Sequence, residues 1–490
     1  MRLKEILSFL PFHERIGYED MEIKSIEMDS RKVKNGDLFV CINGFTVDGH
    51  DYVDEAIQNG AICIVAEKEI TASVPVLHVT DTVRFLGMIA AKFYGFPTQH
   101  IPLIGVTGTN GKTTVTYLLE SIFNHHNQKT GVIGTIQMKI GKDTYPINNT
   151  TPDALFLQKT IHYMIEQDVD KVIMEVSSHA LDLGRVYGCD FDAAVFTNLS
   201  QDHLDYHASM EDYLRAKSLL FAQLGNSYNE KQPKFAIINV DDPASNLLQR
   251  STAQHVVTYG CENEAHIMAR NVSLDATGTR FELVTPVGKV EVNSKLIGKF
   301  NVYNMLAASA VGVAFHIPLS VIKQAFEHIT GVNGRFQPVK SNHNFSVIVD
   351  YAHTPDSLEN VLQTIKGIAE KTIYVVVGCG GDRDKSKRPL MAQIALKYAD
   401  HAIFTSDNPR TEDPTVILQD MTDGLTKDQN NYEVITDRKK AIQQAINLAE
   451  EKDVILIAGK GHETYQQIGH KKHDFDDRIV ALEAIEAKEK

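Results

Sequence analysis

The chain has 490 residues, enough for two to four domains of about 100 to 200 residues each, and three is our central estimate. A hydrophobic content of 43% and a charged content of 23% are typical of a folded globular protein and argue against a disordered chain. The formal net charge of -14 argues against general nucleic-acid binding, because that function relies on many phosphate-neutralising Lys and Arg side chains.

The cysteines and the apolar segments bear on the compartment. The cysteines are scattered, odd in number and never spaced as Cys-x-x-Cys, so neither a disulfide framework nor a thiolate zinc site is expected. The N-terminal segment lacks the long apolar region of a signal peptide, and no segment approaches the roughly 18 apolar residues that cross a bilayer. We expect a cytoplasmic monomer with no membrane partner and with reduced, mostly buried thiols. These cysteines are Cys41, Cys63, Cys189, Cys261 and Cys379.

Apolar runs rich in β-formers alternate with amphipathic helical stretches along most of the chain, which predicts α/β domains with mainly parallel sheets. Such runs begin near residues 61, 101, 171, 193, 235, 371 and 454, too many for one small sheet. Two segments rich in proline or glycine, 95–102 and 329–339, predict boundaries that divide the chain into 1–98, 99–331 and 332–490. In the middle part, residues 274–293 alternate with period two, which predicts a β-meander before a helix near 302–316.

The segment "IPLIGVTGTNGKTTVTYLLESIF", residues 101–123, reads as an apolar strand, a glycine-rich turn and a helix that opens at Lys112. This is the architecture of a P-loop, in which backbone N–H groups and a helix N-terminus bind phosphate oxygens while a lysine neutralises charge. Thr113 stands where a hydroxyl would coordinate magnesium. The usual Gly-x4-Gly-Lys-Ser/Thr pattern is shifted, because Val106 occupies its first position. The alternative is a glycine-rich turn with a chance lysine, which the strand and helix context disfavours.

Two further strand ends carry titratable residues. "VIMEVSSHAL" ends a predicted buried strand on Glu175, whose carboxylate could hold Mg²⁺ opposite Thr113; the alternative is that Glu175 begins a solvated loop. "TNLSQDHLDYH" closes another strand with Asp202, His203, Asp205 and His207, although Asp202 could simply cap a helix. The chain has no Asn-Lys-x-Asp motif for guanine and no helicase-like basic stripe, which argues against a GTPase and a motor NTPase.

From "GVTGTNGKTT" onward the sequence resembles the Mur ligase family of ATP-dependent amide-bond-forming enzymes, whose P-loop has this shifted glycine pattern. The resemblance recurs in order along the chain, at "EVSSHALDLGRV", "TNLSQDHLDYH", "YLRAKSLLF", "GKFNVYNMLAA", "GRFQPV", "DYAHTPDSL", "GCGGDRDKSKRPLM", "SDNPRTEDP" and "AGKGHETYQ". It implies an α/β protein of three domains. They are an N-terminal UDP-muramoyl-binding domain (1–98), a central P-loop ATPase domain with a mainly parallel sheet (99–331), and a Rossmann-like C-terminal domain that binds the amino acid (332–490).

Within the family, "MDSRKVKNGDLFVCINGFTVDGHDY" at residues 28–52 is similar to the members that add the third peptide residue to UDP-N-acetylmuramoyl-L-alanyl-D-glutamate in peptidoglycan precursor synthesis. The reaction implied by the resemblance converts the substrate carboxylate into an acyl phosphate at the expense of ATP. The incoming amine then attacks through a tetrahedral intermediate and releases phosphate. Such chemistry needs charge neutralisation where phosphate oxygens crowd the carboxylate.

The resemblance also implies ATP and Mg²⁺ sites. The expected catalytic residues are Lys112, Glu175, His203 and Lys217. The expected nucleotide contacts are Gly108, Thr109, Asn110, Gly111, Lys112, Thr113 and Thr114 in the loop, Asn304 at the adenine, and Arg335 and Asp350 from the C-terminal domain. The expected metal ligands are Thr113 and Glu175 on one ion, His203 on a second, and Lys217 as a carbamate, which turns a repelling ammonium into an anionic oxygen ligand. By its pattern alone, Lys217 would be a surface helical lysine.

For the muramoyl substrate, the resemblance implies contacts at the uracil end and along the sugar and dipeptide. These are Ser30 at the uracil and Asn149, Thr150, Thr151, Ser177 and Arg185 at the sugar and dipeptide. A Thr-Thr pair before proline is otherwise an ordinary loop, but the ordered series of motifs outweighs that interpretation.

The stretch "SDNPRTEDP", residues 406–414, bears on the amino acid. "DNPR" is the form found in members that add meso-diaminopimelate, whose far end carries a carboxylate beside an ammonium, whereas lysine ends in an ammonium alone. A guanidinium can fork two hydrogen bonds onto that carboxylate. The implied contacts are Arg383, Asn408 and Arg410 on the carboxylate, the Gly459 carbonyl and Glu463 on the ammonium, Asp407 as an orienting residue and Pro409, which sets φ. Asp413 is also expected to cap a helix near Thr415.

Three alternatives stay in view. A lysine-adding relative should lack Arg410, and a folylpolyglutamate-type ligase should lack the N-terminal UDP-binding segment. A non-catalytic nucleotide-binding protein would retain the ATP contacts without ligation, but the presence of Lys112, Glu175, His203 and Lys217 argues against it.

Overall fold

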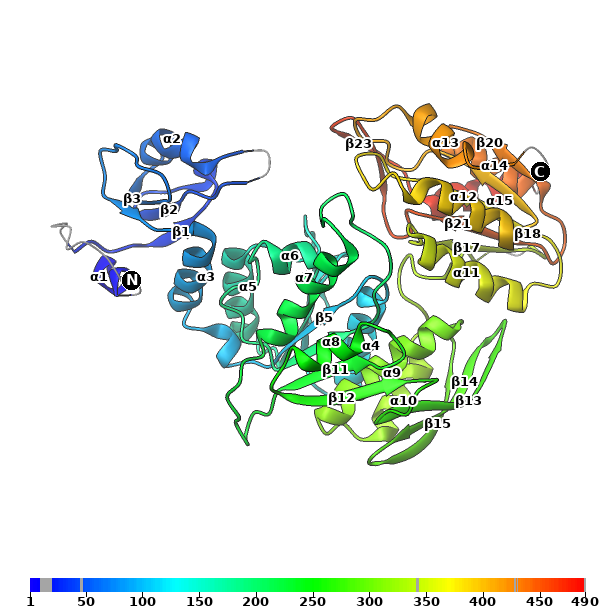
Figure 1. Cartoon of the computed structure of the whole chain (residues 1–490), viewed down its shortest axis with the longest axis horizontal. Helices are drawn as coiled ribbons and strands as arrows, with labels where there is room; N and C mark the ends of the chain where they lie inside the picture. Colours follow the sequence, from blue (N-terminus) through cyan, green and yellow to red (C-terminus); the bar gives the residue numbers. More distant parts are fainter. Residues whose placement is uncertain (9–19, 45–46, 341–342, 427–428, 430, 489–490) are drawn as a thin grey trace.

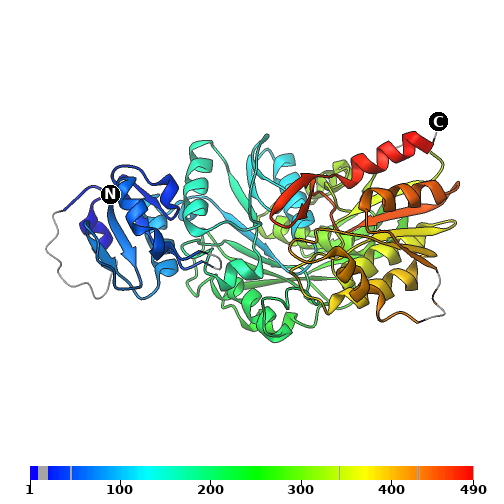
Figure 2. The ribbon, with the colours of Figure 1, turned by 90° about the horizontal axis from the view of Figure 1, so that it is seen from above.

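The computed structural model describes residues 1–8, 20–44, 47–340, 343–426, 429 and 431–488. These residues form three larger sheets that follow one another along an elongated molecule, with the N-terminal sheet at one end and the C-terminal sheet at the other (Figure 1, Figure 2). A two-stranded sheet accompanies the last of them. The α/β class and the need for more than one sheet are confirmed. No helix among the described residues is long and apolar enough to cross a membrane.

The N-terminal sheet is parallel, with the order β1-β2-β3-β4. Its strands are β1 (Ser25–Glu27), β2 (Asp37–Val40), β3 (Ala61–Ala66) and β4 (Val76–His78), and its helices are α1 (Leu3–Leu7), α2 (Val53–Gln58) and α3 (Thr82–Phe93). Short 3-10 turns lie at η1 (Ser30–Lys32), η2 (Gly49–Tyr52) and η3 (Pro97–Gln99). Asp81 caps α3, which leads through η3 into the first strand of the central sheet.

The central sheet has the strand order β15-β14-β13-β12-β11-β10-β5-β9-β6-β7-β8. Pairing is parallel from β13 to β6 and antiparallel at both ends, where β13-β14-β15 form the predicted meander and β6-β7-β8 form a second one. The strands are β5 (Leu103–Thr107), β6 (Thr130–Ile133), β7 (Met138–Ile140), β8 (Asp143–Tyr145), β9 (Lys171–Glu175), β10 (Ala193–Phe196), β11 (Phe235–Asn239), β12 (His255–Gly260), β13 (Ile267–Asp275), β14 (Gly278–Thr285) and β15 (Gly288–Ser294).

Helices cover both faces of the central sheet because the strand side chains alternate between them. Ile104 and Val106 of β5 pack with α4, α9 and α10, whereas Leu103 packs with α5 and α7 on the other face. The helices are α4 (Lys112–His125), α5 (Ala154–Glu166), α6 (Ser178–Asp182), α7 (Met210–Ala222), α8 (Ser245–Arg250), α9 (Lys299–Ala314) and α10 (Leu319–His328). The helix predicted near 302–316 is therefore present as α9.

The C-terminal sheet has the order β16-β17-β21-β18-β19-β20 and is parallel except for β16. Its strands are β16 (Gln337–Pro338), β17 (Ser346–Asp350), β18 (Ile373–Val377), β19 (His401–Phe404), β20 (Tyr432–Val434) and β21 (Val454–Ala458), beside a hairpin of β22 (Tyr465–Ile468) and β23 (Lys471–Asp474). Its helices are α11 (Pro355–Ile368), α12 (Lys387–Tyr398), α13 (Pro414–Thr422), α14 (Arg438–Leu448) and α15 (Asp477–Lys488). The side chain of Asp413 accepts a hydrogen bond from the Thr415 N–H, so the predicted cap of α13 is confirmed.

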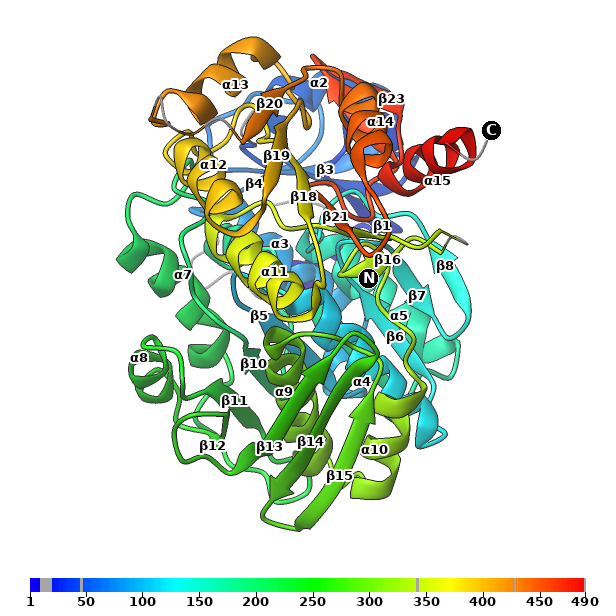
Figure 3. The ribbon, with the colours of Figure 1, turned by 90° about the vertical axis from the view of Figure 1, so that its right-hand side faces the viewer.

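The C-terminal domain meets the central domain through α11 (Figure 1, Figure 3). Thr354 caps this helix and Pro355 occupies its first turn, while Leu358, Leu362 and Ile365 recur at helical spacing on its buried face. Asp356, half-buried in the first turn, accepts a hydrogen bond from the Asn110 side-chain amide at 2.9 Å. This contact joins α11 directly to the loop at residues 108–111, which connects β5 to α4.

Candidate functional site

A cleft of about 760 Å³ lies where the central and C-terminal domains meet. Most of the predicted site residues line it, namely Thr109, Asn110, Gly111, Lys112, Thr113, Thr114, Asn149, Thr150, Thr151, Glu175, Ser177, Arg185, His203, Asn304, Arg335, Asp350 and Arg383. Many of them follow the carboxyl ends of the parallel strands β5, β9, β10 and β17, where α/β folds bind ligands.

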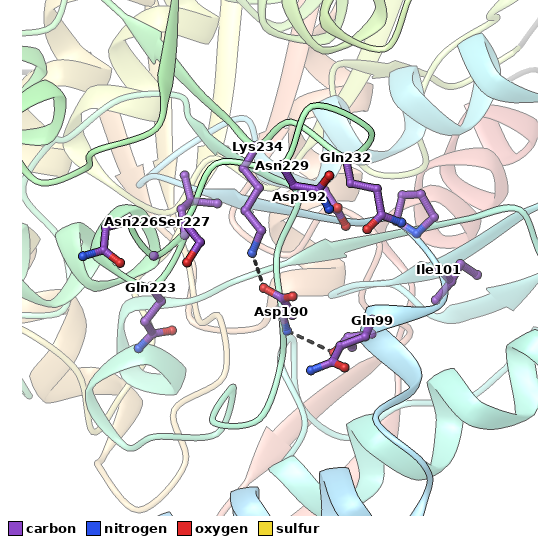
Figure 4. A pocket seen from close by; sticks show the side chains of 14 residues that line it. Gln99, Ile101, Asp190, Asp192, Gln223, Asn226, Ser227, Asn229, Gln232 and Lys234 are labelled. Carbon is purple, nitrogen blue, oxygen red and sulfur yellow. Dashed lines mark hydrogen bonds and ion pairs between the residues drawn. The ribbon is translucent and has the colours of Figure 1, made fainter.

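A second pocket, of about 520 Å³, lies at the opposite edge of the central sheet, where β5, β10 and β11 begin (Figure 4). Figure 4 shows the ion pair between Asp190 and Lys234, surrounded by Asn and Gln side chains. None of the residues predicted to act on substrate lines this pocket. The cleft at the domain junction is therefore the candidate active site.

The nucleotide loop connects β5 to α4 and is held by the adjacent strand β10. Gly108 adopts φ +144°, and a Cβ there would lie 1.9 Å from Thr197 Oγ1, so the loop needs glycine at this point. The backbone N–H of Thr109 donates to the Asn198 carbonyl at 2.8 Å. The Asn110 N–H donates to the Asn198 side-chain oxygen at 2.9 Å.

Two lysines converge on this loop. Lys112 Nζ donates to the carbonyl oxygens of Gly108 and Thr109 at 2.9 and 2.8 Å. Lys217 Nζ, from α7, donates to the same Gly108 carbonyl at 2.9 Å. Lys217 is only 1% exposed, so its interpretation as a surface helical lysine is wrong. Burial, followed by the charge of Lys112, lowers the pKa of Lys217 well below its ordinary value.

Glu175 is also buried, at 1% exposure, so it does not begin a solvated loop. Thr113 Oγ1 lies 3.0 Å from both of its carboxylate oxygens. Thr135 donates to the same carboxylate from its N–H at 2.8 Å and from its hydroxyl at 2.9 Å. A hydroxyl and a carboxylate at a phosphate-binding helix end are the hard oxygen donors that Mg²⁺ prefers, so these residues fit that ion.

His203 faces Asp202, whose carboxylate links the two domains. His203 Nε2 lies 3.3 Å from that carboxylate, and His353 and Lys387 of the C-terminal domain lie 3.7 and 3.6 Å from it. Asp202 therefore does not cap a helix. Burial lowers the pKa of His203 to about 3, so its imidazole is neutral near pH 7 and able to act as a ligand.

Within the described part of the chain, no group of three or more His, Cys, Asp and Glu side chains converges as a metal site.

The remaining predicted nucleotide contacts come from α9 and from the C-terminal domain. Gly111 leaves room for Asn304, because a Cβ at Gly111 would lie 2.4 Å from the Asn304 side-chain oxygen. Arg335 donates to Thr113 Oγ1 at 3.0 Å and stacks on the Tyr351 ring at 4.4 Å. Burial raises the pKa of Asp350, which accepts the Phe336 N–H.

The predicted muramoyl contacts fall into two groups. Thr151 Oγ1 donates to the Glu175 carbonyl at 2.9 Å, and Arg185 donates to the Thr151 carbonyl at 3.2 Å. Ser177 lies beside Thr151 and caps α6, and Asn149 and Thr150 line the same side of the cleft. Ser30 lies apart from them, in the N-terminal domain, where its hydroxyl donates to Glu55.

The predicted amino-acid contacts cluster at the ends of β19 and β21, outside the residues that line the cleft except for Arg383. Arg383 and Arg410 each donate one N–H to a backbone carbonyl, that of Asp382 at 2.8 Å and that of Gly381 at 2.7 Å. Asn408 donates to Glu463 at 2.8 Å, and Pro409 lies between Asn408 and Arg410. Asp407 accepts the Asn408 N–H.

Gly459 comes within reach of this cluster because it lacks a side chain. It adopts φ +114°, and a Cβ there would lie 2.6 Å from Asp407 Oδ2. The carbonyl of Gly459 is thus carried by a loop that packs on Asp407. This contact agrees with an orienting role for Asp407, which is 8% exposed.

Thr135, Asp356 and Lys460 are among the residues of the site that the sequence analysis missed. Thr135 follows the parallel strand β6, Asp356 begins α11, and Lys460 follows β21. These residues share a position in the fold, because each lies just after the end of a strand or in the first turn of the helix that follows the strand. A search of the strand ends predicted from the sequence would have found Lys460, which follows the run near 454, whereas no strand was predicted immediately before Thr135.

Comparisons with known proteins agree with this geometry. Profiles described as "Mur ligase family, catalytic domain", "Mur ligase middle domain" and "Mur ligase, glutamate ligase domain" match residues 22–94, 106–312 and 334–461. A curated protein of Oceanobacillus iheyensis, named UDP-N-acetylmuramoyl-L-alanyl-D-glutamate--2,6-diaminopimelate ligase, is 64% identical and covers 100% of both chains.

Solved structures give the same result. One with the same ligase name is 34% identical, with a TM-score of 0.70, and the match covers 100% of this chain and 99% of the other. MurF ligase from Thermotoga maritima in complex with ADP is 17% identical, with a TM-score of 0.68 and coverage of 96% and 99%. The second similarity concerns the fold alone.

Proposed function

The chain belongs to the Mur ligase family, and on this basis we propose how its residues divide the work of an ATP-dependent ligase. The reaction adds meso-diaminopimelate to the D-glutamate of UDP-N-acetylmuramoyl-L-alanyl-D-glutamate, a step of peptidoglycan precursor synthesis. ATP supplies the phosphate of the acyl phosphate, and ADP leaves.

The observation that carries the choice of amino acid is the arrangement of opposite charges around Asn408. Arg410 stands two residues along the chain from Asn408, and Glu463 accepts the Asn408 amide. The cluster therefore holds a cation, Arg410, near an anion, Glu463. These two charges match the carboxylate and the ammonium at the far end of diaminopimelate. L-Lysine brings only the ammonium, so a guanidinium would meet a like charge.

The loop from Gly108 to Thr114 and Lys112 hold the phosphates of ATP, through N–H groups at the start of α4 and one ammonium. Asn304 contacts the adenine, and Arg335 and Asp350 close on the nucleotide from the C-terminal domain. Thr113 and Glu175 would be ligands of one Mg²⁺, and His203 and a carbamylated Lys217 would be ligands of a second. When bound, these ions neutralise the phosphate oxygens that crowd the substrate carboxylate.

Burial prepares Lys217 for carbamylation. Because its pKa is lowered, more of the amine is neutral at a given pH than in an ordinary lysine, and the neutral amine is the form that adds to CO₂ with loss of a proton. The carbamate replaces an ammonium with an anionic oxygen ligand. The muramoyl substrate runs from Ser30 at the uracil to Asn149, Thr150, Thr151, Ser177 and Arg185 at the sugar and dipeptide.

The substrate sites belong to three domains, 1–98, 99–331 and 332–490, of a cytoplasmic monomer. The test is phosphate release with ATP, Mg²⁺ and UDP-N-acetylmuramoyl-L-alanyl-D-glutamate, with meso-diaminopimelate compared with L-lysine. Release with diaminopimelate alone is expected. Phosphate release with lysine alone would mean that lysine is the amino acid added. No phosphate release with either amino acid would contradict the ligase activity.

A further inference from the structure

Lys460 is a fully buried cation in the amino-acid site. It follows β21, has 0% exposure and lies 5.4 Å from the centre of the Tyr465 ring. Burying an ammonium is costly unless the charge is paired and hydrogen-bonded. Lys460 satisfies this condition, because its Nζ lies 2.8 Å from Glu463 Oε2 and 3.1 Å from Asn408 Oδ1.

These contacts fix the orientation of Asn408. Its side-chain oxygen accepts from Lys460 and from the Gln467 N–H, the latter at 2.8 Å, and its amide nitrogen donates to Glu463. A flipped amide would set a donor against the Lys460 ammonium and an acceptor against a carboxylate. Asn408 is therefore held in one orientation, at 2% exposure.

The same contacts leave one oxygen of Glu463 available. Oε2 receives both the Lys460 ammonium and the Asn408 amide. Oε1 accepts no hydrogen bond from any residue that the structure describes. The carboxylate is thus anchored through one oxygen, while the other can accept an ammonium of the substrate.

Lys460 also sets the charge of this site. Its ammonium and the Arg438 guanidinium hold the pKa of Asp407 below its usual value, against the effect of burial. Arg438 is paired with Asp477 at 2.8 Å. The charged residues among the predicted amino-acid contacts, together with Lys460, are Arg383, Arg410, Lys460, Asp407 and Glu463, whose formal charges sum to one positive charge. A zwitterionic substrate end suits this site better than a second cation does.

We propose that Lys460 is a positioning and specificity-determining residue, which orients Glu463 and Asn408 for the substrate ammonium and makes the site unfavourable to an amino acid without a distal carboxylate. This inference rests on the proposed function, because Lys460 acts on the amino acid through Glu463. Lys460 belongs to no group assigned above to ATP, magnesium or the muramoyl substrate.

The test is the Lys460→Met variant, which keeps an unbranched apolar stem and removes the charge. Lys472→Met is the matched control, because Lys472 lies 4.0 Å from the same Tyr465 ring but is exposed. For K460M we expect the KM for diaminopimelate to rise at least about tenfold, and its preference over L-lysine, as a ratio of kcat/KM, to fall at least about tenfold. The KM values for ATP and the muramoyl dipeptide should stay near those of wild type, and K472M should match wild type throughout.

A second variant keeps the test decisive if K460M, with an unpaired Glu463, fails to fold. The double variant K460M/E463Q carries neither charge, and its KM for diaminopimelate should exceed that of E463Q by clearly less than the effect of K460M on wild type, because much of the Lys460 effect passes through that carboxylate. An unchanged KM and preference in K460M, or a double variant at least about tenfold worse than E463Q, would overturn the inference. If wild type releases phosphate with neither amino acid, the proposed function fails and the inference falls with it.

Discussion

Lys112 and Lys217 donate to the same carbonyl oxygen, that of Gly108, each at 2.9 Å, although they come from different helices. Two ammonium groups on one carbonyl repel each other, and here one of them, Lys217, is buried and the other, Lys112, is half-buried. The conflict is relieved if Lys217 is neutral, and relieved further if it becomes an anionic carbamate. The arrangement therefore gives a physical reason for the modification proposed at this lysine.

Replacing Lys217 with Ala should abolish phosphate release, because the site loses its carbamate oxygen. Short carboxylic acids such as acetate should restore part of the activity, since they can supply the missing oxygen ligand. The rate is measured against acetate concentration, with Ser218→Ala on the same helix as the control. Full activity of K217A without added acid would refute the carbamate.

Replacing Glu175 with Gln should lower the apparent affinity for Mg²⁺ by at least about 10- to 100-fold, because the site loses its charged oxygen donor. The measurement is phosphate release as a function of Mg²⁺ concentration. Glu120→Gln is a matched control, since Glu120 is a buried glutamate of the same domain that pairs with Lys139. Equal Mg²⁺ dependence in E175Q and wild type would exclude Glu175 as a ligand.

Replacing Arg410 with Lys keeps the charge but removes the forked donor. We expect kcat/KM for diaminopimelate to fall on the order of 100-fold, with the KM for ATP nearly unchanged. Arg270→Lys, at an exposed ion pair on β13, is the control. If R410K has the same kcat/KM for diaminopimelate as wild type, Arg410 does not recognise the distal carboxylate.

The stability of the C-terminal domain should depend on pH through Glu412. The hydrogen bond from Arg388, followed by smaller contributions, lowers the pKa of Glu412 from 4.5 to about 2. A lowered pKa means that the contribution is complete above the ordinary value and is lost as the pH falls through about 4.5 toward 2. Glu412→Gln should therefore destabilise the domain by about 1–3 kcal/mol at pH 7 and by progressively less below pH 4.5.

Hydrogen exchange of α12 and α13, followed at pH 7 and at pH 4, measures this difference between wild type and E412Q. Glu370→Gln, at an exposed pair with Lys452, should show no change. A destabilisation that is the same at both pH values would show that the Glu412 charge is not its source.

The proposed substrate sites lie on three domains, so we expect the ligands to draw the domains together. We expect a smaller radius of gyration in small-angle scattering when an ATP analogue and the muramoyl dipeptide are both present. Either ligand alone serves as the comparison. An unchanged radius with both ligands would contradict closure.

The local features of the fold were determined by the sequence itself. The strand, glycine turn and helix around Lys112, the cap of α13 at Asp413 and the meander near Gly278 all depend on neighbouring residues, through periodicity, capping and turn chemistry. Most of the residues that meet at the cleft were predicted by the resemblance to the Mur ligase family, not by these local patterns.

Only the tertiary structure decided what surrounds those residues. Lys217 has the pattern of a surface helical lysine, yet α7 places it against the Gly108 carbonyl, 109 residues away in the chain. Arg335 reaches Thr113 across 222 residues, and Lys460 reaches Asn408 across 52. Burial, charge pairing and the resulting pKa values depend on groups that come together only when distant segments pack, so no local pattern could predict them.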